Sequence, residues 1–147
     1  MPFDEHYFST CTYKDVSFNR FHQYWWSDRV YAMLARRYGP ARGRLLEVGS
    51  GLGHLVHRLE DRYETFACDV NLWALQQSLG IAKGSPHAAC GAQDLPYAEA
   101  AFDIVIIKHV VEHLPHPERA ISEIGRITRD GGLLILATPN LSSRLKP

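Results

Sequence analysis

Apolar positions in this 147-residue chain change their period repeatedly, which divides the sequence into short alternating segments. Short runs rich in branched apolar residues predict buried strands, whereas apolar residues three or four positions apart predict amphipathic helices. Strands are predicted at 44–48, 65–68, 87–90, 102–107 and 133–137. Helices are predicted at 19–38, 52–61, 72–79 and 117–128. A turn at Asp130-Gly131-Gly132 is expected to lead into the last strand.

Strands that alternate with helices of about ten residues indicate βαβ units, and therefore an α/β fold built on a parallel sheet. We predict one compact domain with two parts. An aromatic segment and a helix occupy residues 1–40, and Gly39-Pro40 ends that helix. The sheet and its ligand site occupy residues 41–147. In such sheets, ligands bind at the carboxyl ends of the strands, where the strand order reverses.

The most informative segment is Leu45–His54, in which an apolar run ends in an acid and a glycine-rich loop follows. Glycine occupies every second position of this loop, at Gly49, Gly51 and Gly53. Apolar residues at helical spacing come next, so the segment is predicted to be a strand, a tight turn and a helix start. Glycine lets a backbone approach a ligand closely, and this arrangement is typical of nucleotide-like ligands.

Asp69 is predicted to end the second strand, about 20 residues after Gly49, a spacing typical of a carboxylate that binds ribose hydroxyls. The alternative is a helix cap, since either Asp69 or Asn71 could cap the helix that follows. The glycine-rich loop favours ribose binding.

The residues around the loop restrict the kind of nucleotide. His54 stands where a dinucleotide fingerprint needs glycine, and the loop lacks the lysine of a phosphate-binding P-loop. Glu47, just before the loop, would repel a pyrophosphate. An acid there suits a cationic ligand, and S-adenosylmethionine carries both an ammonium and a sulfonium group.

An ordered set of motifs over about residues 44–140 resembles the class I S-adenosylmethionine-dependent methyltransferases. The first motif, [DE]-x-G-x-G-x-G, matches residues 47–53, and Asp69 follows at the family spacing. The remaining matches are Gln93-Asp94-Leu95-Pro96-Tyr97, Phe102–Val105, Val111–Leu114 and Gly131–Asn140. The branch that the motifs resemble most contains quinone-biosynthesis and related small-molecule or glycan methyltransferases.

The resemblance implies a Rossmann-like parallel sheet of about five strands in the order 3-2-1-4-5, with helices on both faces. It also implies that Glu47 and the loop residues Gly49, Ser50, Gly51 and Gly53 hold the methionine end of S-adenosylmethionine. Asp69 would hold the ribose, and Val70 would line the adenine.

The resemblance extends to residues after the third and fourth strands. Gly91 stands where the family often has an acid that reaches the adenine amino group, so only backbone near Ala92 and Gln93 would contact the ring. Lys108 and His109 would border the methionine end and the transfer site. A lysine is unusual beside a sulfonium, and we expect Lys108 to point to solvent.

Methyl transfer is an in-line displacement that requires mainly alignment, and a base is needed only for an acceptor such as a hydroxyl. His109, Glu112 and His113 are candidate bases by location alone, and they could equally fix the turn after the strand. The same residues form H-x-x-E-H, which is typical of a zinc hydrolase when both histidines lie on one helix. The apolar Val110-Val111 pair favours a continued strand, so we predict no metal site.

Composition restricts the partners and the compartment. Sixteen basic and sixteen acidic residues balance, which does not favour nucleic acid as a partner. No apolar run reaches the roughly 20 residues of a membrane span. The three cysteines, Cys11, Cys68 and Cys90, lack metal-type spacing. We therefore expect a cytoplasmic protein, and the resemblance implies that it acts on a small-molecule or glycan acceptor and releases S-adenosylhomocysteine.

The family sheet normally has two further strands beside the fifth, and this sequence ends at Pro147. An uncovered strand edge invites pairing, so we expect a homodimer through this edge or the adjoining surface. The alternative function is a non-catalytic or truncated module that binds S-adenosylmethionine.

Overall fold

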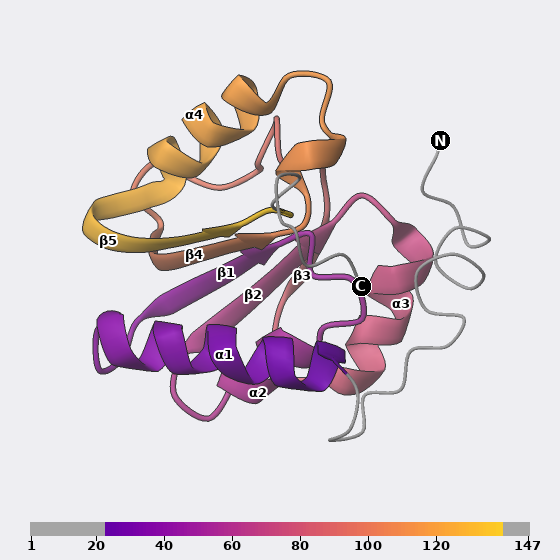
Figure 1. Cartoon of the computed structure of the whole chain (residues 1–147), viewed down its shortest axis with the longest axis vertical. Coiled ribbons are helices and arrows are strands. Elements are labelled where there is room, and N and C mark those ends of the chain that lie inside the picture. The colour runs from indigo at the N-terminus through magenta and orange to yellow at the C-terminus, as the bar shows by residue number, and fades with distance from the viewer. Residues whose placement is uncertain (1–22, 140–147) are drawn as a thin grey trace.

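The computed structural model describes residues 23–139, which form a five-stranded parallel sheet in the order β3-β2-β1-β4-β5 (Figure 1). The strands are β1 (Arg44–Val48), β2 (Glu64–Asp69), β3 (His87–Ala89), β4 (Phe102–Lys108) and β5 (Thr128–Ala137). The helices are α1 (Gln23–Tyr38), α2 (His54–Leu59), α3 (Leu72–Ile81), α4 (Pro117–Ile127) and the short 3₁₀ helix η2 (Val111–His113). The predicted fold class and strand order are confirmed.

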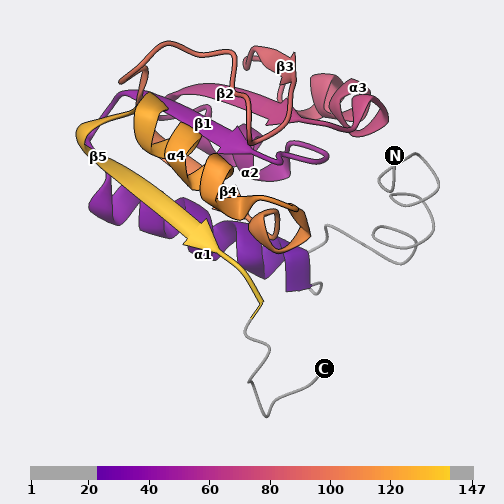
Figure 2. The same ribbon diagram turned by 90° about the horizontal axis from the view of Figure 1, so that it is seen from above.

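The helices cover both faces of the sheet, as expected (Figures 1 and 2). On one face, Leu45 and Ile106 of the central strands pack in a core with residues of α1 and α2. On the other face, Leu46 and Ile107 pack in a core with residues of α4. Because both faces of the central strands are buried, apolar residues stand next to one another in these strands instead of alternating strictly with polar ones.

The strand order reverses at β1, which pairs with β2 on one side and with β4 on the other. A crevice that can hold a ligand is therefore expected beyond the carboxyl ends of β1 and β4. Glu47 is the next-to-last residue of β1, and Lys108 is the last residue of β4. The topology thus brings these two charged residues to the same end of the sheet.

Two predicted elements begin two or more residues away from the expected position. The helix expected at 52–61 is shorter, because the glycine-rich turn continues to Gly53 and α2 begins at His54. The last strand begins at Thr128, directly after α4, and includes the expected turn at 130–132. A register shift against β4 and a positive φ of 73° at Gly131 accommodate the extra chain as a bulge. The start predicted for the first helix, at 19, lies outside the described residues.

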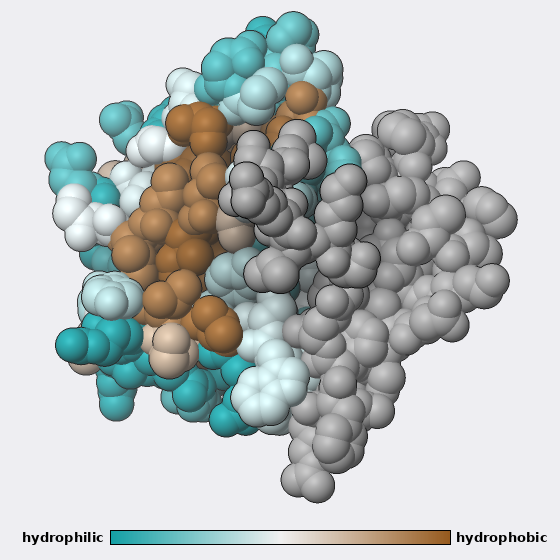
Figure 3. Space-filling model, viewed as in Figure 1, coloured by the Kyte–Doolittle hydropathy of each residue, from teal (hydrophilic) through white to brown (hydrophobic). Residues whose placement is uncertain are grey.

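β5 lies at one edge of the sheet, with β3 at the other (Figure 2). Leu134 and Leu136 of β5 are 41% and 42% exposed. A continuous hydrophobic band crosses the surface over β5, between α4 and α1 (Figure 3). Among the described residues, only β4 pairs with this ten-residue strand, so its outer edge is open to another strand.

Candidate functional site at the carboxyl ends of the strands

The glycine-rich loop leaves β1 and is tied to the end of β2. The backbone N–H groups of Gly49 and Ser50 both donate to Cys68 O, at 2.8 and 3.0 Å. The φ angles of Gly49, Gly51 and Gly53 are 73°, 53° and 77°. Only glycine adopts such left-handed conformations without a steric cost, so the sequence pattern is needed for the turn itself.

Two of the three glycines also make room for the protein's own side chains. A Cβ atom on Gly49 would lie 2.3 Å from Val110 Cγ2, and one on Gly53 would lie 2.0 Å from Ser78 Oγ. Packing against Val110 and Ser78 therefore explains why these two positions need glycine, and no ligand has to be invoked. The role of the loop in holding a cofactor stays a prediction.

Asp69 ends β2, and its buried side chain accepts hydrogen bonds from the backbone of Gly51, Asn71 and Val70. Oδ2 accepts a hydrogen bond from Gly51 N at 2.8 Å, and Oδ1 accepts one from Asn71 N at 2.9 Å. Burial raises the pKa of Asp69, and these hydrogen bonds oppose the shift. Asn71, not Asp69, caps α3, because its side chain accepts a hydrogen bond from Ala74 N. The helix-cap alternative for Asp69 is therefore wrong.

The predicted adenine site lies beside Asp69. Val70 is 48% exposed, and a Cβ atom on Gly91 would lie 3.7 Å from Val70 Cγ1. Ala92 is buried, and the Gln93 side chain donates to His116 O at 2.9 Å, so it is held by the segment before α4. The structure thus brings Val70 and Gly91 together as an apolar surface next to the carboxylate.

A cluster of three charged residues lies behind the glycine-rich loop, between the sheet and α1. Lys108 Nζ donates to Asp28 Oδ1 of α1 at 2.6 Å and lies 3.3 Å from Glu47 Oε1. Its side chain is only 17% exposed. The expectation that Lys108 points to solvent is therefore wrong: two carboxylates attract it into the protein.

The two carboxylates of this cluster differ in their contact with Lys108: Asp28 accepts a hydrogen bond at 2.6 Å, and Glu47 lies farther away, at 3.3 Å. The Glu47 side chain is fully buried, and within residues 23–139 neither of its oxygens accepts a well-aligned hydrogen bond, although Lys108 Nζ lies 3.3 Å from Oε1. Burial raises the pKa of Glu47 to about 7, although Lys108 opposes the shift. Burial also acts to lower the pKa of Lys108, but the attraction of Glu47 and Asp28 outweighs it and raises the pKa overall.

Asp28 is the member of this cluster that the sequence analysis missed. It is buried on the side of α1 that also carries Ala32 and Ala35. An acidic residue among apolar positions at helical spacing needs a cationic partner, and that pattern was a usable signal. The partner comes from a strand 80 residues away in sequence, so the pattern could not identify it.

The segment after β4 has neither of the conformations considered for it. Residues Val111–His113 form a 3₁₀ helix, so Val110-Val111 do not continue the strand, and the two histidines do not share an α-helix. Glu112 Oε1 lies 3.6 Å from His109 Nδ1, and Glu112 Oε2 accepts from Thr138 Oγ1 at 3.2 Å. These contacts fix the turn. Within residues 23–139, no group of three or more His, Cys, Asp or Glu residues could hold a metal ion.

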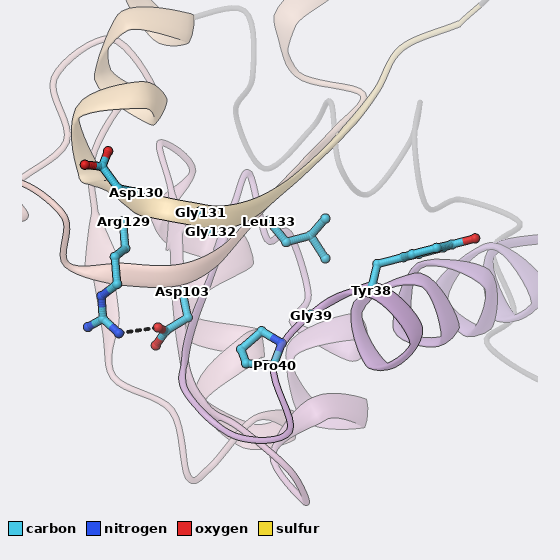
Figure 4. Close-up of a pocket in the computed structure, with 9 residues that line it drawn as sticks. All are labelled: Tyr38, Gly39, Pro40, Asp103, Arg129, Asp130, Gly131, Gly132 and Leu133. Carbon is cyan, nitrogen blue, oxygen red and sulfur yellow. Dashed lines mark hydrogen bonds and ion pairs between the residues drawn. The ribbon is translucent and has the colours of Figure 1, made fainter.

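The opposite end of the sheet has a hollow of about 400 Å³ (Figure 4). Its lining includes Tyr38 at the end of α1, Asp103 of β4, and Arg129 and Gly131 of β5. The Asp103–Arg129 ion pair lies at its wall (Figure 4). This hollow lies at the amino ends of the strands and contains none of the predicted site residues, so we do not assign the ligand to it.

No helix among residues 23–139 is both long and apolar enough to cross a membrane.

Residues 46–136 match the family described as "Methyltransferase domain". An uncharacterized methyltransferase of Mycobacterium leprae is 32% identical over 71% of this chain and 40% of its own length. A malonyl-[acyl-carrier protein] O-methyltransferase of Geobacter sulfurreducens is 31% identical over 75% of this chain and 43% of its own length.

The fold is similar to that of solved methyltransferases. The crystal structure of the N-methyltransferase NodS from Bradyrhizobium japonicum matches with a TM-score of 0.68 and 20% identity, over 77% of this chain and 66% of that one. The chain spans less than half the length of the two curated relatives from Mycobacterium leprae and Geobacter sulfurreducens. Its fold, its ordered motifs and its sequence similarity agree: the chain belongs to the class I S-adenosylmethionine-dependent methyltransferase family.

Proposed function

We propose that the protein binds S-adenosylmethionine where β1, β2 and β4 end and transfers its methyl group to a small-molecule or glycan acceptor. The observation that supports this proposal best is the Glu47 carboxylate, which is fully buried and, within the described residues, has the 3.3 Å ion pair with Lys108 but no well-aligned hydrogen bond. A buried carboxylate is costly unless charged donors satisfy it, and Lys108 is shared with Asp28. The ammonium group of the cofactor's methionine end is such a donor, so the residues present fit this cofactor.

The adenosine half fits the neighbouring strand end. The Asp69 carboxylate accepts backbone hydrogen bonds from Gly51, Asn71 and Val70, and because its two oxygens offer about four acceptor sites it retains capacity for a ribose hydroxyl. Val70 and Gly91 offer an apolar surface for the adenine ring. Ser50, Ala92 and Gln93 stay predicted contacts through their position in the same loops.

Bound S-adenosylmethionine supplies an electrophilic methyl group, so the protein's main task is to hold the acceptor in line with it. His109 is half exposed and lies next to Glu112, which makes it the candidate base for a hydroxyl acceptor. The similar proteins include both O- and N-methyltransferases, so the similarity does not identify the methylated atom.

Calorimetric titration with S-adenosylmethionine and S-adenosylhomocysteine tests the cofactor assignment. Saturable binding of both compounds is the expected result. Absence of heat at about 1 mM ligand, where only negligible affinity would escape detection, contradicts the proposal. Turnover with a panel of hydroxyl, amine and glycan acceptors then separates an enzyme from a binding module.

The second candidate function is a non-catalytic module that binds S-adenosylmethionine, and the open edge of β5 favours it. In the described residues, nothing packs over the exposed side chains of Leu134 and Leu136. We also propose that β5 pairs with a second copy of the chain. Size-exclusion chromatography with light scattering should show a dimer at tens of micromolar, and a clean monomer contradicts this pairing.

A further inference from the structure

We propose that Lys108 binds the carboxylate of the cofactor's methionine end, while Asp28 holds Lys108 in place and Glu47 takes the ammonium. This inference rests on the proposed binding of S-adenosylmethionine and extends it to a residue that departs from the family pattern. It assigns a binding role to Lys108 and a positioning role to Asp28 of α1.

The first argument is geometric. Lys108 Nζ donates a hydrogen bond to Asp28 at 2.6 Å, whereas its 3.3 Å ion pair with Glu47 is longer and, within the described residues, is the closest charged contact of that carboxylate. An ammonium group has three donor hydrogens, so Lys108 can bind a further acceptor while it keeps Asp28. The cation and the unsatisfied carboxylate lie side by side, at the spacing at which an amino acid presents its two opposite charges.

The second argument is the charge of the cluster. With both acids ionised, Asp28, Glu47 and Lys108 carry a net charge of −1 in a buried location. S-adenosylmethionine carries one carboxylate, one ammonium and one sulfonium, which sum to +1. Binding the whole amino acid end therefore neutralises the cluster, and the ammonium and the carboxylate of that end each find a partner of opposite sign.

The alternative is that Lys108 merely fastens α1 to the sheet. A buried ion pair stabilises packing only weakly, because the cost of desolvation cancels much of the attraction. An apolar pair of similar volume often gives equal or greater stability. A fastener would also need only one carboxylate. The second, unsatisfied carboxylate next to the glycine-rich loop is explained by a ligand and not by the attachment of a helix.

The test compares three compounds by calorimetry on the full chain at about pH 8, where Glu47 is mostly ionised. They are S-adenosylmethionine, its decarboxylated form and methylthioadenosine, which lacks the whole amino acid end. We expect the wild type to bind S-adenosylmethionine at least about tenfold more tightly than the decarboxylated form, the scale of one charged hydrogen bond. Equal affinities in the wild type would overturn the inference without any variant.

In Lys108→Met, we expect that selectivity to disappear, because the carboxylate loses its partner while the decarboxylated form benefits from the two acids. Affinity for methylthioadenosine should not change, which shows that the adenosine site is intact. Retained selectivity in this variant would show that Lys108 only fastens α1. Lys83→Met is the matched control, since it removes an exposed lysine at the opposite end of the sheet.

Asp28→Asn is a second variant that tests the inference even if Lys108→Met does not fold. It leaves Lys108 and Glu47 in place but removes the hydrogen bond that orients Lys108. We expect it to reduce the selectivity by about threefold or more, on the scale of a single net hydrogen bond. Unchanged selectivity contradicts the positioning role. If the wild type binds none of the three compounds, the proposed function itself has failed, which is distinct from equal binding of all three.

Discussion

At the amino end of the sheet, Asp103 has a hydrogen-bond partner for each carboxylate oxygen, whereas at the carboxyl end Glu47 has, within the described part of the chain, a 3.3 Å ion pair and no well-aligned hydrogen bond. Asp103 accepts from Arg44 N at 2.8 Å and pairs with Arg129, beside the hollow shown in Figure 4. The end with the hollow has a satisfied carboxylate, and the end with the family motifs has a buried carboxylate whose ion pair with Lys108 spans 3.3 Å. A hollow alone is therefore a poor guide to function here, and an unsatisfied buried charge is a better one.

The largest expected contrast between the two ends concerns glycine. Gly53 and Gly131 have similar φ angles, 77° and 73°, so an alanine at either position suffers a similar conformational strain. An added Cβ atom on Gly53 would meet Ser78 Oγ at 2.0 Å, whereas one on Gly131 has nothing within 4 Å. We expect Gly53→Ala to lower the free energy of unfolding by about 3–4 kcal/mol and Gly131→Ala by only about 1 kcal/mol.

Urea unfolding measures this contrast. Gly80→Ala provides a third point, because Gly80 lies within α3 and an added Cβ atom also has nothing within 4 Å. Alanine should stabilise that helix by about 0.5–1 kcal/mol. Equal losses for Gly53→Ala and Gly131→Ala would show that packing against Ser78 does not matter.

The second contrast concerns the carboxylates and has opposite signs at the two ends. The folded-state pKa of Glu47, about 7, lies above its ordinary value of 4.5. The folded state therefore binds the extra proton between these values, and the protein loses stability as pH rises through this window. Glu47→Gln removes this loss, so relative to the wild type it should gain about 2–3 kcal/mol between about pH 5 and pH 8.

Asp103→Asn should instead lower the free energy of unfolding by about 1 kcal/mol, because it weakens satisfied hydrogen bonds. Thermal or urea unfolding of both variants at the two pH values decides the matter. Glu47→Gln should also weaken binding of S-adenosylmethionine at least about tenfold, through the lost ammonium partner. If Glu47→Gln is destabilising at about pH 8, the carboxylate is satisfied in a way that the structure does not show.

The smallest contrast separates two residues of one strand end. Asp69→Ala should weaken binding of S-adenosylmethionine by about 1–3 kcal/mol, the scale of lost hydrogen bonds to a charged acceptor. Asn71→Ala should leave that affinity unchanged but lower stability by about 1 kcal/mol, since it removes the cap of α3. Calorimetric titration and unfolding curves of both variants measure the two effects. Unchanged affinity in Asp69→Ala would remove the ribose assignment.

The sequence by itself determined those elements whose apolar pattern is compatible with only one type of secondary structure. β1 has the predicted bounds, because Arg44–Val48 is an apolar run closed by a glycine turn. The parallel sheet follows from the alternation of strands and helices, since strands that run the same way need crossover helices. The tight turn at Gly49, Gly51 and Gly53 could also be predicted, because few residues other than glycine adopt left-handed conformations.

Tertiary structure decided which charged groups meet. Nothing local to Lys108 shows that it turns inward, because the attraction comes from Asp28 and Glu47 on other elements. The start of β5 at Thr128 likewise depends on its register with β4, which a polar, glycine-containing segment does not reveal. Local pattern fixes how each segment folds, because backbone sterics and apolar period act over a few residues. Long-range pairing fixes the electrostatics of the site, because a buried charge responds to whichever neighbours the fold brings within a few ångströms.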